Sequence, residues 1–548
     1  MLITCPTFLI LTVGNNLRLM KRIIIYLVFT IFLFSCSSDD PVNELPDDTD
    51  TIDEINLPEL QTNEVTDITL YSVKTGGRLI DTGDSDIIEV GLVVGLTSLP
   101  TTESNLNKFI LTPDDSGNFN ITITSIPAST TYFIRAYGIN SEGIGYGNEV
   151  QFSSLEENIY VGNITLSTQD EVNQFGVNEY TTIDGSMYIE GTVTDLSPLE
   201  SIVIINNAFE VKNTQSLQNL EGLNNLKITG NIFPNGFRIE NNSALESLSG
   251  LNNLEITRGY SYIINNDNLI DMQGLNSYYA ASAGEFRIQE CDGLQSLSGL
   301  ENLQFIGDSF FLMDNSLLND ISSLSNLNYI DRRIYIHNNS NLQNIDGFEA
   351  ITSLEGLSII NNDNLNNLDG LINVSTISDI ITISYNDNLN DLSVFQNINT
   401  VEYLNIEGNN SLINLVGFNN LTSIGNQLDI YDNSSLSSLN GIENLNSLQR
   451  LRIHSNPSLT NLSGLSGLTT ITGNSYPITI GYNSSLNSLT GFENLIQVEG
   501  FIQIFSNSML NDFCALKNLF INDGHNGNIN FSGNLNNPST DEIINNCN

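Results

Sequence analysis

The feature that most constrains this chain is a repeat of about 24 residues that runs from residue 198 to near the C-terminus. Two columns of residues keep register along it. The first is mostly glycine: Pro198, Gly222, Gly250, Gly274, Gly299, Ser323, Gly347, Gly370, Val394, Gly417, Gly441, Gly464, Gly491 and Ala515. The second is mostly asparagine and runs from Asn242 to Asn534. Such a repeat is typical of a solenoid, in which each repeat forms one turn of a coil and packs against its neighbours.

Each repeat has the consensus G-(L/F)-x-N-L-x-x-I-x-x-x-L-x-I-x-x-N-x-x-L-x-x-L-x. The L-x-I pair predicts a short strand with two inward side chains, and stacked copies of it predict a parallel sheet. The other apolar positions are predicted to line the rest of the coil, and the glycine permits a tight turn. The sequence therefore predicts a mainly β fold.

The asparagine column is predicted to be structural. Each Asn follows its strand by two positions, where the chain must turn inside the coil. A side-chain amide there can satisfy backbone groups that a buried turn would leave unpaired. Cys291 occupies the same column as a small buried substitute. The predicted structural ladder consists of Asn242, Asn266, Asn315, Asn339, Asn362, Asn386, Asn409, Asn433, Asn456, Asn483 and Asn507.

The consensus and the N/C alternation resemble leucine-rich repeats, and more closely the receptor L-domain type of β-solenoid. The resemblance covers roughly residues 160–548 and implies a leucine-rich-repeat-like parallel β-solenoid. It carries almost no information about a ligand. We divide this region into a solenoid at 156–513 and a C-terminal cap at 514–548, with a short helix feeding a first strand at Met187–Ile189 as the N-terminal cap.

The N-terminus has the pattern of a secretion signal. "MKRIIIYLVFTIFLFSC", residues 20–36, has a basic end, a short apolar core and a cleavage region. It predicts that Met20 is the true start, that residues 1–36 comprise an over-called start and a signal peptide, and that cleavage precedes Cys36. "LFSC" resembles a bacterial lipobox, which implies a lipid on Cys36; an ordinary signal peptide with an incidental Cys is the alternative. Residues 37–57 form an acidic linker whose Ser/Asp-rich start resembles the surface-export signals of Bacteroidota lipoproteins.

Residues 58–155 have a different sequence pattern. Segments in which apolar and polar residues alternate, such as "FNITITSI", lie between short turn sequences. This spacing predicts a small β-sandwich. "IPASTTYFIRAYGINSEGIGYGNEVQF" resembles the end of a fibronectin type III domain, with Tyr132 as its corner tyrosine and Arg135 and Asn140 matching the family pattern. By that resemblance the domain is a spacer or interaction module.

Two cysteines bracket the C-terminal cap, Cys514 and Cys547. In an exported protein they are predicted to form a disulfide that clamps the cap. The pairing also leaves Cys36 for the lipid and Cys291 buried.

Outward strand positions fall into columns that repeat along the sheet and make a candidate binding surface. One such position lies between the two inward residues, and another follows the strand. Aromatic and Arg side chains in these columns are typical of recognition surfaces, although aromatics also simply suit exposed strands. The candidate binding residues are Arg238, Tyr262, Arg287, Phe311, Tyr335, His337, Tyr385, Tyr431, Arg452, His454, Tyr482 and Phe505.

Catalysis is not expected. His337 and His454 are five repeats apart, roughly 24 Å at ~4.8 Å per strand, too far for one metal or proton relay. The carboxylates Glu407, Asp429 and Asp432 on adjacent repeats leave a polysaccharide-degrading enzyme as the least favoured alternative. No cofactor and no metal site is predicted, since no ordered ligand spacing occurs. The 63 acidic against 17 basic residues also exclude a nucleic acid held by phosphate neutralisation.

The sequence thus predicts a lipoprotein of the bacterial outer membrane, anchored through Cys36 and exposed at the cell surface. We expect its solenoid to bind an extended extracellular protein or glycan non-covalently, in adhesion or recognition. The alternative is a structural spacer or stalk without a specific ligand.

Overall fold

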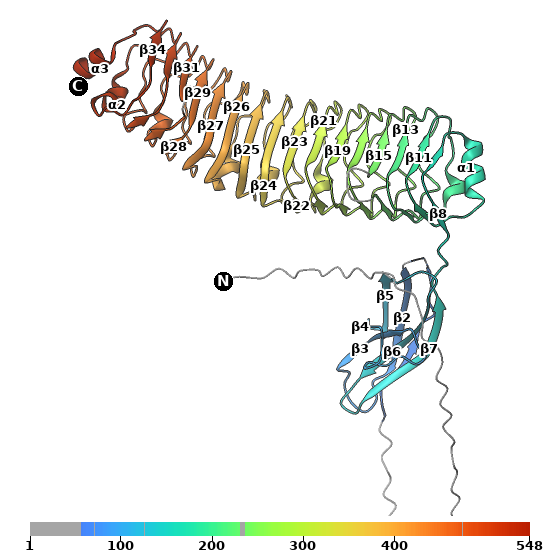
Figure 1. Ribbon diagram of the computed structural model, residues 1–548. Helices are drawn as coiled ribbons and strands as arrows, with labels where there is room; N and C mark the ends of the chain where they lie inside the picture. Colours follow the sequence, from blue (N-terminus) through green and yellow to red (C-terminus); the bar gives the residue numbers. More distant parts are fainter. Residues whose placement is uncertain are drawn as a thin grey trace, which may run out of the picture. The chain divides into compact units, whose positions relative to one another are not determined.

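The computed structural model describes residues 56–547 except 69, 71, 125, 231–235 and 474. The predicted signal segment, Met20, Cys36 and nearly all of the 37–57 linker lie outside these residues. Within them, an antiparallel N-terminal region precedes a parallel β-solenoid of about 15 turns (Figure 1). The predicted fold class is confirmed: the chain is mainly β, with turns about 24 residues apart.

One side of the solenoid is a long parallel sheet in which each strand pairs with its equivalent one turn away. For example, Ile336 of one strand is in register with Ile359 of the next. Its strands are β9 (Ile164–Leu166), β11 (Met187–Glu190), β13 (Phe209–Lys212), β15 (Phe237–Glu240), β17 (Ser261–Ile264), β19 (Phe286–Gln289), β21 (Phe310–Met313), β23 (Arg333–His337), β24 (Ser353–Ile360), β25 (Thr376–Ser384), β26 (Thr400–Glu407), β27 (Ser423–Tyr431), β29 (Arg450–His454), β31 (Ile478–Gly481), β33 (Ile502–Phe505) and β34 (Ile529–Ser532).

A second run of short parallel strands forms another side of the early turns. It consists of β8 (Ile159–Val161), β10 (Thr182–Asp184), β12 (Ile204–Ile205), β14 (Ile228–Thr229), β16 (Ile256–Thr257), β18 (Ala280–Ala281), β20 (Phe305–Ile306) and β22 (Tyr329–Ile330). In the middle turns the two strands of a turn merge, so that β24, β25, β26 and β27 each run for eight or nine residues. Later turns separate them again as β28 (Ser447–Leu448), β30 (Thr470–Ile471) and β32 (Gln497–Val498).

The third side is made of turns, some of them 3-10 helical. These are η1 (Ser197–Leu199), η2 (Ser322–Leu324), η3 (Asp369–Leu371), η4 (Ser393–Asn397), η5 (Ser463–Leu465) and η6 (Cys514–Leu516). Many residues of the glycine column have a positive φ here, and a Cβ on Gly417 (φ 128°) would lie 1.9 Å from the Leu392 carbonyl oxygen of the preceding turn. Only glycine fits that close approach.

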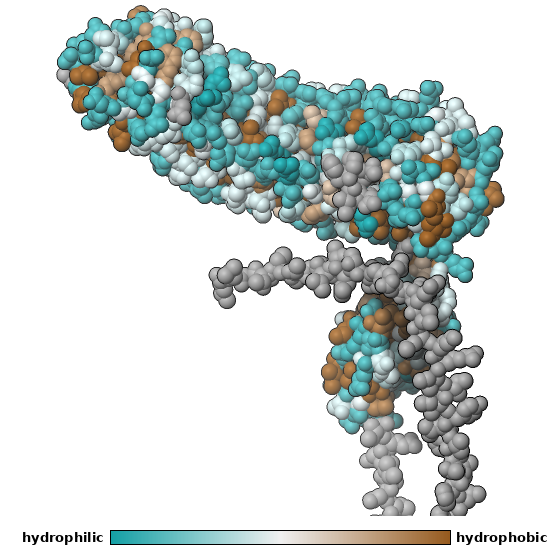
Figure 2. Space-filling view, in the orientation of Figure 1, coloured by the Kyte–Doolittle hydropathy of each residue, from teal (hydrophilic) through white to brown (hydrophobic). Residues whose placement is uncertain are grey.

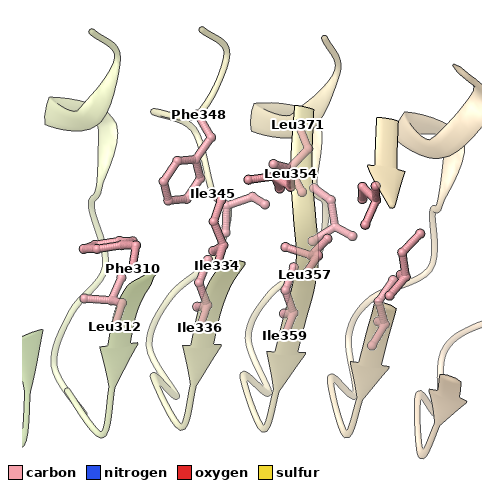
Figure 3. Close-up of a cluster of buried hydrophobic side chains, with 14 of the residues drawn as sticks. Phe310, Leu312, Ile334, Ile336, Ile345, Phe348, Leu354, Leu357, Ile359 and Leu371 are labelled. Carbon is pink, nitrogen blue, oxygen red and sulfur yellow. The ribbon is translucent and has the colours of Figure 1, made fainter. Parts of the chain in front are cut away.

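The core is one continuous apolar column inside the coil. The L-x-I residues of the strands point into it, as Phe310 with Leu312 and Ile334 with Ile336 illustrate in Figure 3. Phe348 and Leu371 from the third side meet them, and all of these side chains are almost completely buried. A single turn cannot bury this surface alone, so stability comes from stacking.

The asparagine column lies inside the coil, with the side chains from Asn242 to Asn507 fully buried. Asn339 shows the pattern: its backbone N–H donates to Asn362 Oδ1 at 3.0 Å, and its side-chain amide donates to the carbonyls of Leu312 and His337 at 2.9 and 3.0 Å. Its own Oδ1 accepts from the backbone N–H of Asn315 at 3.2 Å. Each Asn therefore joins three successive turns.

The ladder has an exception and two ends that the sequence pattern did not fully reveal. Cys291 donates its backbone N–H to Asn315 Oδ1, and burial raises the pKa of its thiol to about 12, so it remains an uncharged thiol. Thr214 begins the ladder by donating to Asn242 Oδ1, and Asn537 ends it by accepting from Asn534. A left-handed backbone conformation occurs in the residue that precedes each position of the ladder from Asn242 to Asn507. Asn338, which precedes Asn339, has a φ of 59°.

Both ends of the solenoid are covered. At the start, α1 (Gln169–Gly176) is capped by Thr168 and buries Val172 and Phe175 against the first turns. Strands β8 and β9 come before this helix, so the solenoid begins one turn earlier than the strand at Met187–Ile189 that the sequence predicts. At the other end lie α2 (Lys517–Ile521) and α3 (Thr540–Asn546). The predicted disulfide between Cys514 and Cys547 is confirmed.

The N-terminal region consists of two antiparallel sheets around a core of its own. One contains β1 (Glu59–Thr62), β2 (Ser72–Asp81) and β5 (Asn118–Thr124), and the other β3 (Glu89–Gly95), β4 (Asn107–Ile110), β6 (Thr131–Ile139) and β7 (Ile144–Ser153). Tyr132 is completely buried, stacks on Phe152 and donates to the Pro127 carbonyl at 3.4 Å. Asn140 donates to the Thr82 carbonyl, and the Arg135 guanidinium lies over the ring of Tyr146. The fibronectin type III resemblance stays a prediction.

Replacing Asn362 with Ala should destabilise the chain by about 3 kcal/mol or more, because it removes hydrogen bonds to buried backbone groups of two successive turns, the Asn339 N–H and the Ile336 and Ile360 carbonyls. Urea unfolding followed by circular dichroism measures this. The matched control is Asn364→Ala, which removes an exposed side chain with one hydrogen bond to the Ser340 carbonyl and should cost less than about 1 kcal/mol. Equal losses in the two variants would contradict a structural ladder.

The double variant Cys514→Ser/Cys547→Ser should unfold at lower temperature, since the disulfide closes a loop between residues 33 positions apart. A loop of this length stabilises by roughly 3–4 kcal/mol in the chain-entropy account. Thermal unfolding with and without dithiothreitol is the measurement. The reductant should lower the melting temperature of the wild type and leave that of the double variant unchanged; a shift in both would contradict the assignment.

Candidate binding face

The candidate site is the outward surface of the long sheet, which we call the outer face. Because successive strand side chains alternate, the residues between and after the inward pair all point outward. The burial pattern of β15 to β21 shows this alternation of buried and half-buried residues. The parallel register then places equivalent residues of successive turns side by side, so each outward column is continuous.

The early turns carry a continuous stack of Arg and aromatic side chains on the outer face. The guanidinium of Arg238 lies 4.7 Å from the ring centre of Tyr262, and that of Arg287 lies 4.1 Å from the ring centre of Phe311. Phe311 and Tyr335 are parallel, with their ring centres 4.5 Å apart. We call these five residues the Arg–aromatic stack.

Carboxylates hold the cations of the stack in place. Arg238 pairs with Glu240 at 2.7 Å, and Arg287 pairs with Glu285 at 3.2 Å. The hydroxyl of Tyr262 also donates to Glu285. Most ring faces in the stack are thus covered by their neighbours, and a partner contacts mainly the ring edges and the guanidinium rims.

The stack ends at Tyr335. The next members of its column are the small residues Ser358 and Thr382, followed by Asn405. His337, beside Tyr335 on the same strand, shares a hydrogen bond of 2.8 Å with Ser358 Oγ and packs edge-on against the Tyr335 ring. The outer face therefore changes from bulky and planar to small and polar at β24.

The later turns form a second group around β26, β27 and β29. Tyr431 and His454 stack with their ring centres 4.7 Å apart, and Arg452 approaches Asp429 at 3.4 Å. Glu407 is only 9% exposed, and its carboxylate accepts from the hydroxyl of Tyr385.

Tyr385 and Tyr482 differ from the other candidates in backbone and exposure. Both have a positive φ in the turn after their strand and are 40% and 58% exposed. The hydroxyl bond to Glu407 raises the pKa of Tyr385 to about 12. Phe505 packs edge-on against Tyr482 at 5.1 Å.

The three acidic residues of the enzyme alternative occupy unlike environments. Glu407 is bound by Tyr385, and burial raises the pKa of Asp429 although Arg452 lies beside it. Asp432 is exposed at a left-handed turn, off the strand. Over the described part of the chain, no three His, Cys, Asp or Glu side chains gather as a possible metal site.

A third outward column escaped the sequence reasoning. It is the residue just before the first inward position and includes Tyr403, Gln427 and Arg450, which line a hollow of about 290 Å³. Gln427 donates to Asp429 at 2.5 Å and accepts from Arg450 at 3.1 Å. Tyr403 and Gln427 lie within the merged strands β26 and β27, and Arg450 is the first residue of β29. Polar and aromatic residues at this position in consecutive repeats were the signal that could have revealed it.

Comparison with known proteins places the chain in no family. No family model matches it, and no curated protein does. Among solved structures it is similar to the solution structure of the sensor domain of the anti-sigma factor RsgI4 in Pseudobacteroides cellulosolvens. The identity is 17%, with 18% of this chain and 76% of that chain covered, and the TM-score is 0.16. Within the described ranges, no helix is long and apolar enough to cross a bilayer.

Replacing His337 with Gln should reduce the pH dependence of stability between pH 7.5 and 6.0. Burial lowers the pKa of His337 below its usual 6.5, so the unfolded chain takes up a proton near pH 6.5 while the folded chain does not. This group therefore destabilises the fold as the pH falls, and its removal makes the decline shallower. Urea midpoints at the two pH values provide the measurement.

The control for that experiment is Ser358→Ala, which removes the same hydrogen bond but keeps the imidazole. It should retain the pH dependence of the wild type. A His337→Gln variant with an unchanged pH dependence would show that this imidazole titrates alike in the folded and unfolded chains.

Proposed function

We propose that this chain is a lipid-anchored bacterial surface protein whose solenoid binds an extended partner non-covalently through its outer face. The observation that carries the binding proposal is the concentration of Arg and aromatic side chains in register on one face, the Arg–aromatic stack with the Tyr431, Arg452 and His454 group beyond it. Such residues supply large contact areas at low entropic cost in recognition.

Preorganisation supports binding. The stacked side chains of Arg287, Phe311 and Tyr335 are already fixed by one another and by Glu285. A partner therefore immobilises few rotamers when it contacts this face, and the entropic cost of association is correspondingly small. Because the columns extend over many turns, the partner that fits is itself extended, a protein or a glycan.

The anchoring part of the proposal depends on the sequence. The lipobox-like "LFSC" and the Ser/Asp-rich residues after Cys36 support a lipid anchor and export to the surface of the outer membrane in a Bacteroidota-type cell. Residues 58–155 then serve as a fibronectin type III-like spacer or interaction module. The disulfide between Cys514 and Cys547 suits an oxidising compartment.

A structural spacer remains the second candidate. It is favoured by the ion pairs and stacking within the Arg–aromatic stack, which stabilise the solenoid whether or not a partner is present. A spacer predicts that removing whole turns shortens the reach of the protein without loss of any specific ligand. The binding proposal predicts the loss of a ligand when outer-face side chains are truncated.

The chain from residue 37 onward should bind selected ligands on protein and glycan arrays. Its triple variant Tyr335→Ala/Tyr431→Ala/Arg452→Ala should lose at least tenfold in affinity, as expected when interface anchors are truncated. The matched control is Tyr279→Ala/Tyr329→Ala/Lys227→Ala. Tyr329 lies in the short strand β22, and Tyr279 and Lys227 directly precede β18 and β14, on another side of the coil. Unchanged affinity in the outer-face variant, or an equal loss in the control, would refute the proposal.

A further inference from the structure

The last strand of the long sheet, β34, has an open edge. Figure 1 shows it at the C-terminal end of the coil, and among the described strands its register partners lie in β33 alone. The Ile502 N–H donates to the Asn528 carbonyl at 2.9 Å, so Asn528 faces β33. Because successive residues of a strand direct their backbone groups to opposite sides, Ile529 and Phe531 face the other way. Their N–H and C=O groups therefore point toward the open edge.

The last turn also leaves its inward side chains incompletely covered. In β33 the inward residues Ile502 and Ile504 are fully buried, because β31 and β34 lie on either side of them. Their equivalents in β34, Ile529 and Phe531, pack against the same core but are only partly buried. Burial of the remaining apolar surface is favourable. A further strand paired with β34 would therefore cover both side chains.

The sequence around β34 lacks the features by which exposed edge strands avoid pairing. Such strands carry charged side chains, prolines or bulges, or are very short. Between Asn526 and Asn537 no charged residue and no proline occurs, in a chain with 63 acidic residues. At the opposite end of the sheet, β9 has three residues instead of four, and α1 follows closely and packs against it. Of the two ends of the sheet, the C-terminal one is therefore better suited to pairing.

The open edge is complementary to itself. When two copies of β34 run antiparallel about a two-fold axis at Asn530, Ile529 of each copy lies opposite Phe531 of the other. Each residue presents one N–H and one C=O at the edge, so each of the two pairs forms two hydrogen bonds. Asn530 lies opposite its own counterpart as a non-hydrogen-bonded pair on the outer face. A two-fold contact of this kind uses the same surface on both copies and closes at a dimer.

Charge favours this end of the sheet as the contact between two copies. Two copies of an acidic chain repel each other wherever their carboxylates meet. The last three strands, β31, β33 and β34, contain no charged residue, and their outward positions are occupied by Thr479, Gly481, Gln503, Phe505, Asn530 and Ser532. In the cap, Asp541 and Glu542 belong to α3, which the disulfide joins to η6 on the third side. Repulsion between two copies is therefore small where the edges of β34 meet.

We propose that two copies of this chain bind each other end to end through antiparallel pairing of β34, with Asn530 at the two-fold axis. The two solenoids then extend in opposite directions, and their N-terminal ends lie at the far ends of the dimer. For copies anchored through their N-termini, as proposed above, this contact joins chains on two facing surfaces. The pairing itself involves the edge of the sheet and does not depend on a ligand of the outer face.

The contact is small, and the dimer is correspondingly weak. A pair of four-residue strands is smaller than a standard interface, which buries about 800 Å² per partner. We therefore expect a dissociation constant in the micromolar to millimolar range. Many copies on each of two facing surfaces strengthen such a contact through their high effective concentration.

The test is sedimentation equilibrium of the chain from residue 37 onward, at concentrations up to about 1 mM so that a weak dimer is populated. The wild type should dimerise. Asn530→Lys and Asn530→Asp should each remain monomeric, because like charges then lie directly opposite each other at the two-fold axis. An equimolar mixture of these two variants should dimerise again, since opposite charges then face each other.

The matched control is Thr479→Lys. It adds the same charge at a half-buried position of the same outward column, two strands away from the edge, and should dimerise as the wild type does. All of these variants should keep the urea midpoint of the wild type, since the changed side chains point outward. A wild type that stays monomeric, an Asn530→Lys variant that dimerises normally, or a mixture that stays monomeric would overturn the proposal. Assembly of the wild type beyond a dimer would indicate an open head-to-tail contact and overturn it as well.

Cross-linking of Asn530→Cys gives a second measurement. The Cα atoms of a non-hydrogen-bonded antiparallel pair are about 4.5 Å apart, a separation that a disulfide can span. Mild oxidation should therefore produce a covalent dimer. The native thiols do not compete, because Cys291 is buried and Cys514 is paired with Cys547. The control Thr479→Cys should remain uncross-linked, and equal cross-linking of the two variants would contradict pairing through β34.

Discussion

The buried asparagine ladder is the interaction on which the rest of the structure depends. A coil that turns its chain inward once per repeat leaves backbone N–H and C=O groups away from water, and each must find a partner. One carboxamide per turn supplies them, because it donates twice and accepts twice within a small volume. Asn362, for example, donates to the Ile336 and Ile360 carbonyls and accepts from the Asn339 N–H.

The ladder also fixes the outer face. Since each Asn joins its turn to the turns on either side, neighbouring strands cannot slip in register without breaking several buried hydrogen bonds. Every outward column is therefore continuous, which allows Arg238, Tyr262 and Arg287 to pack on one another across successive turns. The same rigidity keeps Asn405 and Asp429 side by side, although each has a side-chain oxygen without a hydrogen bond. The stability of the buried interior offsets the free energy that these unpaired oxygens cost.

Much of the fold was predictable because the same packing and hydrogen-bonding requirements recur at the same positions of every repeat. The L-x-I strands, the buried Asn column and the turn glycines each follow from the period. The terminal disulfide followed from chemistry instead, since only Cys514 and Cys547 flank the cap. The boundary at residue 156 includes β8 and β9, but the first strand was expected only at Met187–Ile189, because β8 and β9 lie before α1 and carry neither the glycine nor the asparagine of the repeat. The terminal turn of a solenoid packs against a cap instead of another repeat, so its residues differ from the repeat consensus.

The candidate site was predictable only in part. The sequence identified two outward columns and their Arg and aromatic residues, yet it could not show that Phe311 and Tyr335 cover each other or that Arg287 is held by Glu285. The third column with Tyr403 and Arg450 became visible only from the register of β26, β27 and β29, which places Tyr403, Gln427 and Arg450 side by side.

The sequence by itself determined the coil: its period, its inward residues and the asparagines that satisfy its interior, because these depend on contacts that recur at a fixed spacing. The tertiary structure alone decided which outward side chains pair with one another and which polar atoms remain without a partner. Those outcomes depend on side chains from different turns meeting across the sheet, and their distances and orientations are set by the stacking of whole turns rather than by any one repeat.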